Sequence, residues 1–334
     1  MRLLFFGGTL FLGRHLAEAA LGRGHQVTTF TRGLTATGLF PDAEEMHGDR
    51  AADLSALEGR EWDGVVDTSG YLPRVVGASA RALAGAAGHY TFVSSINAYA
   101  DLDRRVSEDS PLARLDEGSS ENVQEHYGPL KVLCEQAVAG AFGSDRTLVV
   151  RPGLIVGPHD PTGRFSYWVE RIAAGGEVLA PGDPERLVQL IDARDLAAWI
   201  LDMVEQGSAG AFNATSPRLP MRAVLEACGD ARLTWVEDDF LLGRGVSEWD
   251  ELPLWLVDPS VRGMLDADVS RAVGAGLSFR PVAETARDTL DWLRANAGKP
   301  RPALPGVQLP QAGMDPARER ELLAEWHRRS GPDA

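Results

Sequence analysis

The hydrophobic residues at the start of the chain follow two different spacings. Residues 2–6 form a short apolar run, residues 13–22 carry apolar side chains at helical spacing, and residues 26–30 are rich in β-branched and aromatic side chains. A short apolar run favours a strand, and a period near 3.6 residues favours a helix. The pattern therefore predicts a strand, a helix and a second strand in this order.

The same alternation continues through the first half of the chain. Short apolar runs are separated by Ala-rich stretches with helical spacing, of which residues 75–87 are one. Strands that alternate with helices form a parallel sheet with helices on both faces, because the crossovers are right-handed. We therefore expect an α/β fold with a doubly wound parallel sheet of the Rossmann type. The further strands are expected at residues 45–47, 64–67, 89–94 and 147–151.

Proline and glycine interrupt this pattern after Pro152, and residues 195–214 return to a helix followed by a strand. The interruption predicts a smaller C-terminal substrate lobe built around a segment that rejoins the first domain. Asp315 and Pro316 provide an N-cap and a first-turn proline for a final helix. The predicted division is a dinucleotide-binding domain at 1–155 with 187–215 returning to it, a substrate lobe at 156–186 and 216–300, and a linker with a C-terminal helix at 301–334.

Composition limits the partners. The 334 residues are 44% hydrophobic and 24% charged, with a formal net charge of −15, which is ordinary for a globular enzyme and repels phosphate backbones and anionic membranes. We therefore expect neither nucleic acid nor a membrane as partner. Cys134 and Cys228 lack the spacing of a zinc or redox motif, so no metal is expected. The first apolar run is too short for a membrane span or a signal peptide, which predicts a cytoplasmic protein.

A glycine-rich turn joins the first predicted strand to the first helix. Glycines there let the backbone approach a pyrophosphate, and the following helix offers free N–H groups. A tight turn that binds nothing is the alternative, but the position within a βαβ unit favours the binding interpretation. The residues expected to contact the cofactor here are Gly7, Thr9, Leu10, Phe11, Leu12 and Gly13.

The end of the second strand indicates which cofactor binds. An NAD site usually offers a carboxylate to the ribose hydroxyls at this point, whereas this chain offers Thr31 and Arg32. The planar guanidinium of Arg32 suits a ribose 2′-phosphate, although a solvated loop arginine is the alternative. We therefore predict NADP as the cofactor, with NAD as the alternative.

Tyr127 and Lys131 are four residues apart in a stretch of helix formers, and Ser95 ends an earlier strand. A spacing of four places the phenol and the ammonium on one helical face. Tyrosine has an ordinary pKa of about 10, so action as a base near neutrality needs a shift of roughly three units. A nearby ammonium has the right sign to lower that pKa.

The order of these motifs resembles a known superfamily. A glycine turn, a double serine after a later strand and then Tyr-x-x-x-Lys resemble the short-chain dehydrogenase/reductase superfamily over most of the chain. The segment at 191–196 (IDARDL) and Arg151-Pro152-Gly153 look like its extended epimerase/dehydratase branch. The resemblance also covers residues 48–50 and 66–71.

The resemblance implies a role for each matching residue. Tyr127 is the expected acid/base, Lys131 lowers its pKa and holds the nicotinamide ribose, and Ser95 orients the substrate. Ser95 is preferred to Ser94 because it stands four residues before Tyr99, as the serine does in the family. The further residues expected at the cofactor are Asp49, Arg50, Thr68, Ser69, Gly70, Pro152, Gly153 and Ile155. Those expected at the substrate are Tyr71, Asn97, His159 and Arg164.

The chain departs from the family pattern at three places. Leu10 replaces a glycine, Thr31-Arg32 replaces the ribose-binding acid, and Asp192 stands where nucleotide-sugar epimerases usually have histidine. These departures indicate an atypical member and argue against an ordinary UDP-sugar as the substrate.

Taken together, the residues and the resemblance predict an NAD(P)-dependent oxidoreductase or epimerase. We expect hydride exchange with a secondary alcohol or ketone on a polar small molecule, such as a sugar or nucleotide-sugar derivative. Reductase, epimerase and dehydratase stay open, as does a homodimer. The alternative is a catalytically silent NAD(P)-binding regulator or RNA-associated protein of the atypical branch, against which the intact serine, tyrosine and lysine set argues.

Overall fold

The computed structural model describes residues 1–34, 36–115, 120–299 and 312–330. Within these residues, the main sheet has seven parallel strands in the order β11–β6–β5–β4–β1–β2–β3. The strands are β1 (Arg2–Phe6), β2 (Gln26–Thr31), β3 (Glu44–His47), β4 (Gly64–Asp67), β5 (Tyr90–Val93), β6 (Thr147–Pro152) and β11 (Gly210–Ala214).

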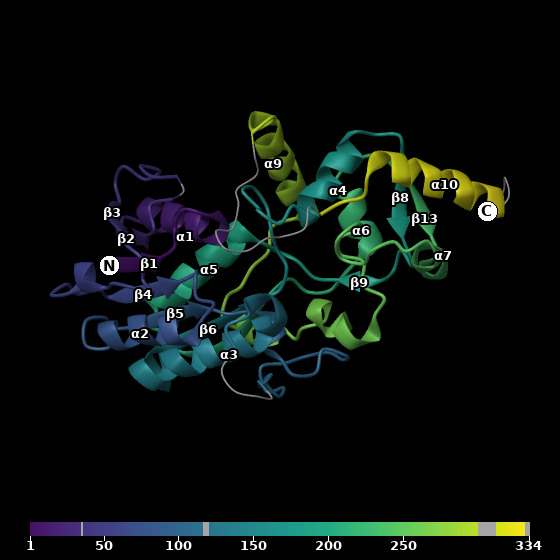
Figure 1. Ribbon diagram of the computed structural model, residues 1–334. Coiled ribbons are helices and arrows are strands. Elements are labelled where there is room, and N and C mark those ends of the chain that lie inside the picture. The colour runs from purple at the N-terminus through teal and green to yellow at the C-terminus, as the bar shows by residue number, and fades with distance from the viewer. Residues whose placement is uncertain (35, 116–119, 300–311, 331–334) are drawn as a thin grey trace.

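Both faces of this sheet are covered by helices, which explains the continuous apolar runs of its strands. Leu3 and Phe5 of β1 point to one face, where they join the core beneath α1 (Phe11–Gly22) and α5 (Ala193–Glu205). Leu4 and Phe6 alternate to the opposite face and join the core beneath α2 (Pro73–Leu83) and α3 (Val123–Phe142) (Figure 1). The predicted doubly wound Rossmann sheet is confirmed.

The strand order reverses between β1 and β4. The connections that leave the carboxyl ends of these two strands run in opposite directions, which leaves a crevice at the top of the sheet. The glycine turn after β1 and the residues 68–70 after β4 meet there: the amide of Thr68 donates to the carbonyl oxygen of Phe6 at 3.1 Å. This reversal point is where the candidate cofactor residues gather.

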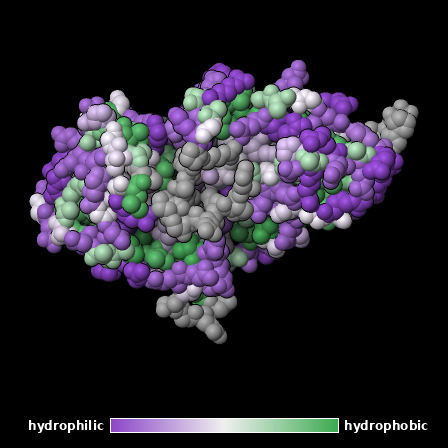
Figure 2. Space-filling model, turned by 45° about the horizontal axis from the view of Figure 1, so that its top comes forward, coloured by the Kyte–Doolittle hydropathy of each residue, from purple (hydrophilic) through white to green (hydrophobic). Residues whose placement is uncertain are grey.

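A second lobe lies beside the sheet and has its own hydrophobic core, which includes the fully buried Trp168 and Trp255. The final helix, α10 (Pro316–Ser330), closes this core with Leu322 and Leu323. In Figure 2 hydrophilic residues cover most of the visible face of this lobe, and hydrophobic residues form separate small patches. The other elements of the core are α4 (Arg164–Ala173), β8 (Glu177–Pro181), α6 (Met221–Glu226), β13 (Arg232–Val236) and α7 (Asp238–Gly243).

Short elements connect the two lobes. The helix α9 (Val282–Ala295) packs against α4, and β7 (Ile155–Val156) pairs in parallel with β10 (Ile191–Asp192). The remaining elements are β9 (Leu187–Val188), β12 (Leu219–Pro220), α8 (Ser270–Gly274) and the 3₁₀ helices η1 (Ser55–Leu57), η2 (Ile96–Ala98), η3 (Ser144–Arg146) and η4 (Pro259–Leu265).

The expected segments of the first domain lie where the pattern placed them, with ends that differ by up to four residues. The helix expected at 75–87 runs from Pro73 to Leu83, because Pro73 suits the first helical turn. Much of the linker expected from residue 301 lies outside the described residues, and the proposed domain division stays a prediction. Among the helices that the structure describes, none is long and apolar enough to cross a membrane.

Candidate active site

The glycine turn after β1 is packed too closely for larger residues. A Cβ atom on Gly7 would lie 2.6 Å from the Thr68 hydroxyl, and one on Gly13 would lie 2.7 Å from the backbone nitrogen of Gly8. Gly7 also has a φ of +100°, which an L side chain rarely adopts. The N-cap residue of α1, Leu10, supplies no side-chain cap, so the first N–H groups of α1 suit a bound phosphate.

The residues predicted at the adenine end lie on neighbouring strand ends. Arg32 follows β2 and is exposed, while Asp49 follows β3. A hydrogen bond of 2.8 Å from the amide of Gly48 to the carbonyl of Thr31 holds these two ends together. The structure therefore brings Arg32 and Asp49 to one edge of the crevice.

Arg50, predicted to contact the cofactor, is bound to another partner. Its guanidinium donates twice to the buried carboxylate of Asp67 at 2.8 Å and lies 4.2 Å from the ring centre of Phe6. The hydroxyl of Tyr90 and the amide of Ser69 also donate to Asp67, at 2.9 and 3.0 Å. Burial by itself would raise the pKa of the Asp67 carboxyl, but Arg50 and these donors lower it overall. Arg50 thus supports the backbone at Ser69, and its direct contact with a cofactor stays a prediction.

The helix that carries Tyr127 is shaped to bring its phenol to the end of β5. The chain kinks at His126, with φ −119° and ψ 31°, so that regular α-helix restarts at Tyr127. A Cβ on Gly128 would lie 2.0 Å from the carbonyl oxygen of Asn97. Only glycine permits this approach, which places Tyr127 beside Ser95 and Asn97.

The two serines after β5 have different surroundings. The hydroxyl of Ser94 donates to the buried carboxylate of Glu135 at 2.5 Å, and Arg151 donates to the same carboxylate at 3.0 and 2.6 Å. Ser95 accepts a hydrogen bond from the amide of Asn97 at 3.1 Å. Since Ser94 belongs to this inner network, the geometry supports Ser95 as the serine on the Tyr127 side. Sequence reasoning missed Glu135, although its position four residues after Lys131 was a usable signal.

The buried ammonium of Lys131 is held by backbone carbonyls. Its Nζ donates to the carbonyls of Gly70 and Val93 at 2.8 and 2.6 Å. Burial lowers the pKa of Lys131 to about 8, so it is largely protonated at neutral pH. Burial raises the pKa of Tyr127 well above its usual value, and hydrogen bonding with Ser95 opposes this only in part. The lowering of the tyrosine pKa by Lys131 stays a prediction, since the net shift of Tyr127 in this structure is upward and the ammonium donates to two carbonyls.

A cavity of about 810 Å³ opens beside Tyr127. Its walls come from the loop after β5, the start of α3 and η4, so both lobes contribute. Of the four predicted substrate residues, Asn97 lines this cavity, whereas Tyr71, His159 and Arg164 lie outside the described lining. The cavity is also lined by Tyr99, Leu102, Leu112, Arg114, Gln124, Glu125, Val261 and Met264.

His159 and Arg164 lie on the loop and helix that enter the second lobe. The ring of His159 contacts those of His15 and Trp292, with centroids 5.7 and 5.0 Å apart, and burial lowers the pKa of His159 to about 4. The guanidinium of Arg164 lies 5.2 Å from the ring centre of Trp249. Neither side chain is among the residues that line the cavity at Tyr127.

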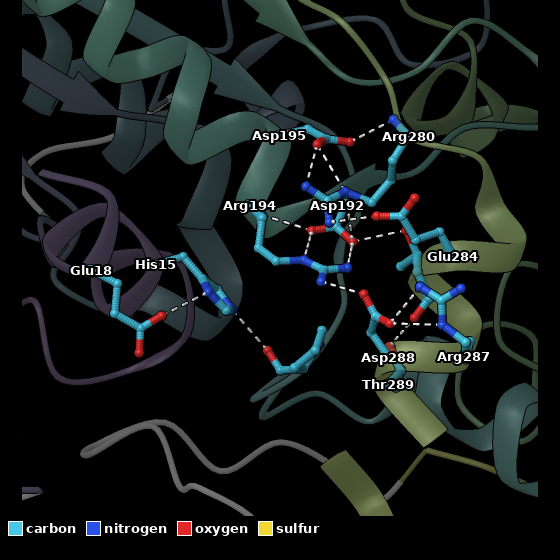
Figure 3. A network of polar contacts seen from close by, with 12 residues as sticks. His15, Glu18, Asp192, Arg194, Asp195, Arg280, Glu284, Arg287, Asp288 and Thr289 are labelled. Atoms are coloured by element: carbon cyan, nitrogen blue, oxygen red, sulfur yellow. Dashed lines mark hydrogen bonds and ion pairs between the residues drawn. The ribbon is translucent and has the colours of Figure 1, made fainter. Parts of the chain in front are cut away.

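Asp192, noted above as a departure from the family pattern, is at the centre of a charged network (Figure 3). Its nearly buried carboxylate accepts hydrogen bonds from Arg194 at 2.9 and 2.7 Å and from the hydroxyl of Thr285 at 2.8 Å. Arg280 lies 3.5 Å away and donates to Asp195 at 2.7 Å. The network joins the start of α5 to α9, so Asp192 has a structural function.

Comparison with known proteins shows a relative in a plant. The chain is 25% identical over 254 residues to the chloroplast stem-loop binding protein of 41 kDa b of Arabidopsis thaliana, which covers 69% of this chain and 63% of that relative. The matched region is thus less than two thirds of the plant protein.

Solved structures share the fold. WbmH of Bordetella bronchiseptica, in complex with NAD⁺, superposes with a TM-score of 0.64 at 17% identity, covering 88% of this chain and 98% of that one. The UDP-glucuronic acid 4-epimerase of Bacillus cereus, in complex with NAD, gives 0.62 at 16% identity, covering 88% and 99%. Finally, the family model described as NAD dependent epimerase/dehydratase family matches residues 3–214. The chain belongs to the NAD-dependent epimerase/dehydratase family.

Proposed function

We propose that this chain is a nicotinamide-dependent enzyme that exchanges hydride with a secondary alcohol or ketone on a polar small molecule. A sugar or nucleotide-sugar derivative is the class that the family and the solved neighbours favour. The observation that carries the proposal is the position of Tyr127, which lines a cavity built by both lobes while Lys131 lies one helical turn behind it.

The crevice at the strand reversal fits a dinucleotide. Glycine at positions 7 and 13 keeps side chains out of the turn before α1, and the first N–H groups of this helix have no side-chain cap, so they suit a pyrophosphate. Arg32 and Asp49 are the proposed adenine-side residues, and the lack of a carboxylate directly after β2 favours NADP over NAD. When bound, the nicotinamide ring supplies or accepts the hydride.

The protein residues move the proton. Since the pKa of Tyr127 is raised in this structure, its hydroxyl carries a proton at neutral pH and suits donation to a carbonyl oxygen in the cavity. Ser95 is proposed to orient the same oxygen. Lys131, fixed by two carbonyls, keeps a positive charge behind the phenol, which favours the phenolate that accepts the proton when a substrate hydroxyl is oxidised.

A labelling experiment tests the proposal. The purified protein would first be analysed by absorption spectroscopy and mass spectrometry for a copurified nucleotide. It would then be incubated with deuterated NADPH or NADH and a panel of keto-sugars, sugar nucleotides and simple ketones. Deuterium in the product identifies a reductase, and epimerised product with the original hydrogen retained identifies an epimerase. A protein that binds the cofactor but transfers no hydride across the panel would contradict the proposal.

A second candidate function is suggested by the plant relative, whose name states that it binds stem-loops. RNA association in this chain would have to overcome a net charge of −15, which repels a phosphate backbone. Titration with a stem-loop RNA at several salt concentrations decides between the two candidates. Salt-sensitive binding at physiological ionic strength, without any hydride transfer, would favour the second.

A further inference from the structure

Tyr71 lies beside Tyr127 and Lys131, yet the proposed mechanism does not use it. It follows residues 68–70 at the end of β4, and the carbonyl of its neighbour Gly70 accepts a hydrogen bond of 2.8 Å from Lys131. The ammonium also lies 5.4 Å from the centre of the Tyr71 ring. These two contacts fix the ring relative to Lys131.

The same ring faces Tyr127. The centroids of the two tyrosine rings are 6.4 Å apart, with planes tilted by 42°. Tyr127 lines the cavity, whereas Tyr71 lies outside its described lining. A substrate in this cavity would therefore meet Tyr127, and Tyr71 would act on the reaction through the neighbours that its ring contacts, Tyr127 and Lys131.

Two phenols at this separation in a buried site cannot easily ionise together, because each phenolate opposes the charge of the other. Burial raises the pKa of Tyr71, and the Asp67 carboxylate raises it further. Burial likewise raises the pKa of Tyr127, and Tyr71 is the next largest cause. The other titratable or charged groups around the pair are Asp67 from β4, Arg50 after β3, and Lys131, Cys134 and Glu135 from α3.

We propose that Tyr71 is a positioning residue for the acid/base: its ring supports Tyr127 at the cavity wall, and the two hydroxyls form a coupled pair of which only one ionises readily. The catalytic part of this inference rests on the proposed function. The coupling itself is a property of the folded protein.

The coupling can be measured without a substrate. All five tyrosines would be replaced biosynthetically by 3-fluorotyrosine, which lowers phenol pKa values, and each would be titrated by ¹⁹F NMR across the pH range in which the protein stays folded. Single Tyr→Phe variants assign the signals. In Tyr71→Phe, which keeps the ring, we expect the titration midpoint of Tyr127 to fall by about one pKa unit, because a nearby ionisable hydroxyl is removed.

The matched control is Tyr167→Phe, which removes a buried phenol in α4 of the second lobe and should leave the Tyr127 midpoint unchanged. The Tyr127→Phe variant tests the same coupling through Tyr71: without the Tyr127 hydroxyl, the two-step titration of Tyr71 should become a single step. An unchanged Tyr127 midpoint in a folded Tyr71→Phe protein would overturn the inference. If Tyr71→Phe does not fold, a Tyr71 titration unaffected by Tyr127→Phe would overturn it equally.

The pH profile of hydride transfer separates this inference from the proposed function. If both hold, the basic-side dependence of substrate oxidation moves to lower pH in Tyr71→Phe. If the NMR coupling is present but no hydride is transferred by the wild type, the proposed function fails while the coupled pair stands.

Discussion

The proton on the Tyr127 hydroxyl is held more tightly than that of a tyrosine in water. Burial disfavours the phenolate, and the neighbouring Tyr71 raises the pKa of Tyr127 further. The residue therefore acts first as an acid in this structure. Its chemistry depends on a few atoms around one hydroxyl, so single substitutions are informative.

Replacement of Tyr127 by phenylalanine removes that hydroxyl and keeps the ring. We expect turnover to fall by about 10²- to 10⁴-fold, the usual contribution of general acid–base catalysis, while cofactor affinity changes little. Steady-state kinetics and a cofactor titration by fluorescence measure both. Turnover at the wild-type level in Tyr127→Phe would remove the tyrosine from the mechanism.

Replacement of Arg32 by alanine tests the choice of cofactor. The exposed guanidinium after β2 is expected to contact a 2′-phosphate, so the variant should lose affinity for NADPH by roughly 10-fold or more and barely change its affinity for NADH. Arg81→Ala, at an exposed position of α2, is the control. If the ratio of the two dissociation constants stays the same, Arg32 lies outside the cofactor site.

The helix α3 shows how one element positions the acid/base. Its kink at His126 and the contact of Gly128 with Asn97 set where Tyr127 begins the regular helix. A second glycine, Gly140, lies in the same helix with open space around it. Within this one helix, the position of Gly128 excludes a side chain, whereas that of Gly140 has room for one.

Substitution of alanine at these glycines separates close packing from helix propensity. Gly128→Ala places a methyl against the Asn97 carbonyl and should destabilise the protein by about 1–3 kcal/mol, with a loss of turnover as Tyr127 shifts. Gly140→Ala should instead stabilise it by about 0.5–1 kcal/mol, since alanine restricts the unfolded chain. Urea denaturation measures both, and equal effects of the two variants would contradict the packing argument.

On the scale of the whole molecule, charged groups join the two lobes. The helix α9 packs on α4 of the second lobe, and the network around Asp192 connects it to α5 on the sheet (Figure 3). Burial alone would raise the pKa of Asp192, but the hydrogen bonds and charge of Arg194 lower it overall. Asp192 therefore stabilises the fold in its charged form.

Replacement of Asp192 by alanine leaves Arg194 and Thr285 without this acceptor, and we expect a loss of about 3 kcal/mol in the free energy of unfolding at pH 7. Because the folded pKa is depressed, the contribution is present above the unfolded pKa, about 3.9, and is lost as pH falls through the folded value. The difference between wild type and variant should thus shrink below about pH 4. Asp291→Ala, an exposed carboxylate on α9, is the control. A pH-independent difference between wild type and Asp192→Ala would contradict this role.

The sequence by itself determined the first lobe and the main chemical groups of the site. Strands buried on both faces must be apolar throughout, so β1, β4 and β6 are visible as runs, and a tight strand–helix turn must use glycine, so the phosphate loop is visible at Gly7 and Gly13. These are local requirements, satisfied within a few residues. The order of the motifs along the chain was enough to indicate the family.

Only the tertiary structure decided which partners the charged groups take. Arg50 binds Asp67, Lys131 binds two carbonyls, and Glu135 binds Ser94 and Arg151. The core of the second lobe likewise combines segments from α4 to α10 with no single period. Each of these contacts joins residues far apart in sequence or depends on how two elements approach, and the spacing of residues along the chain carries no information about that approach.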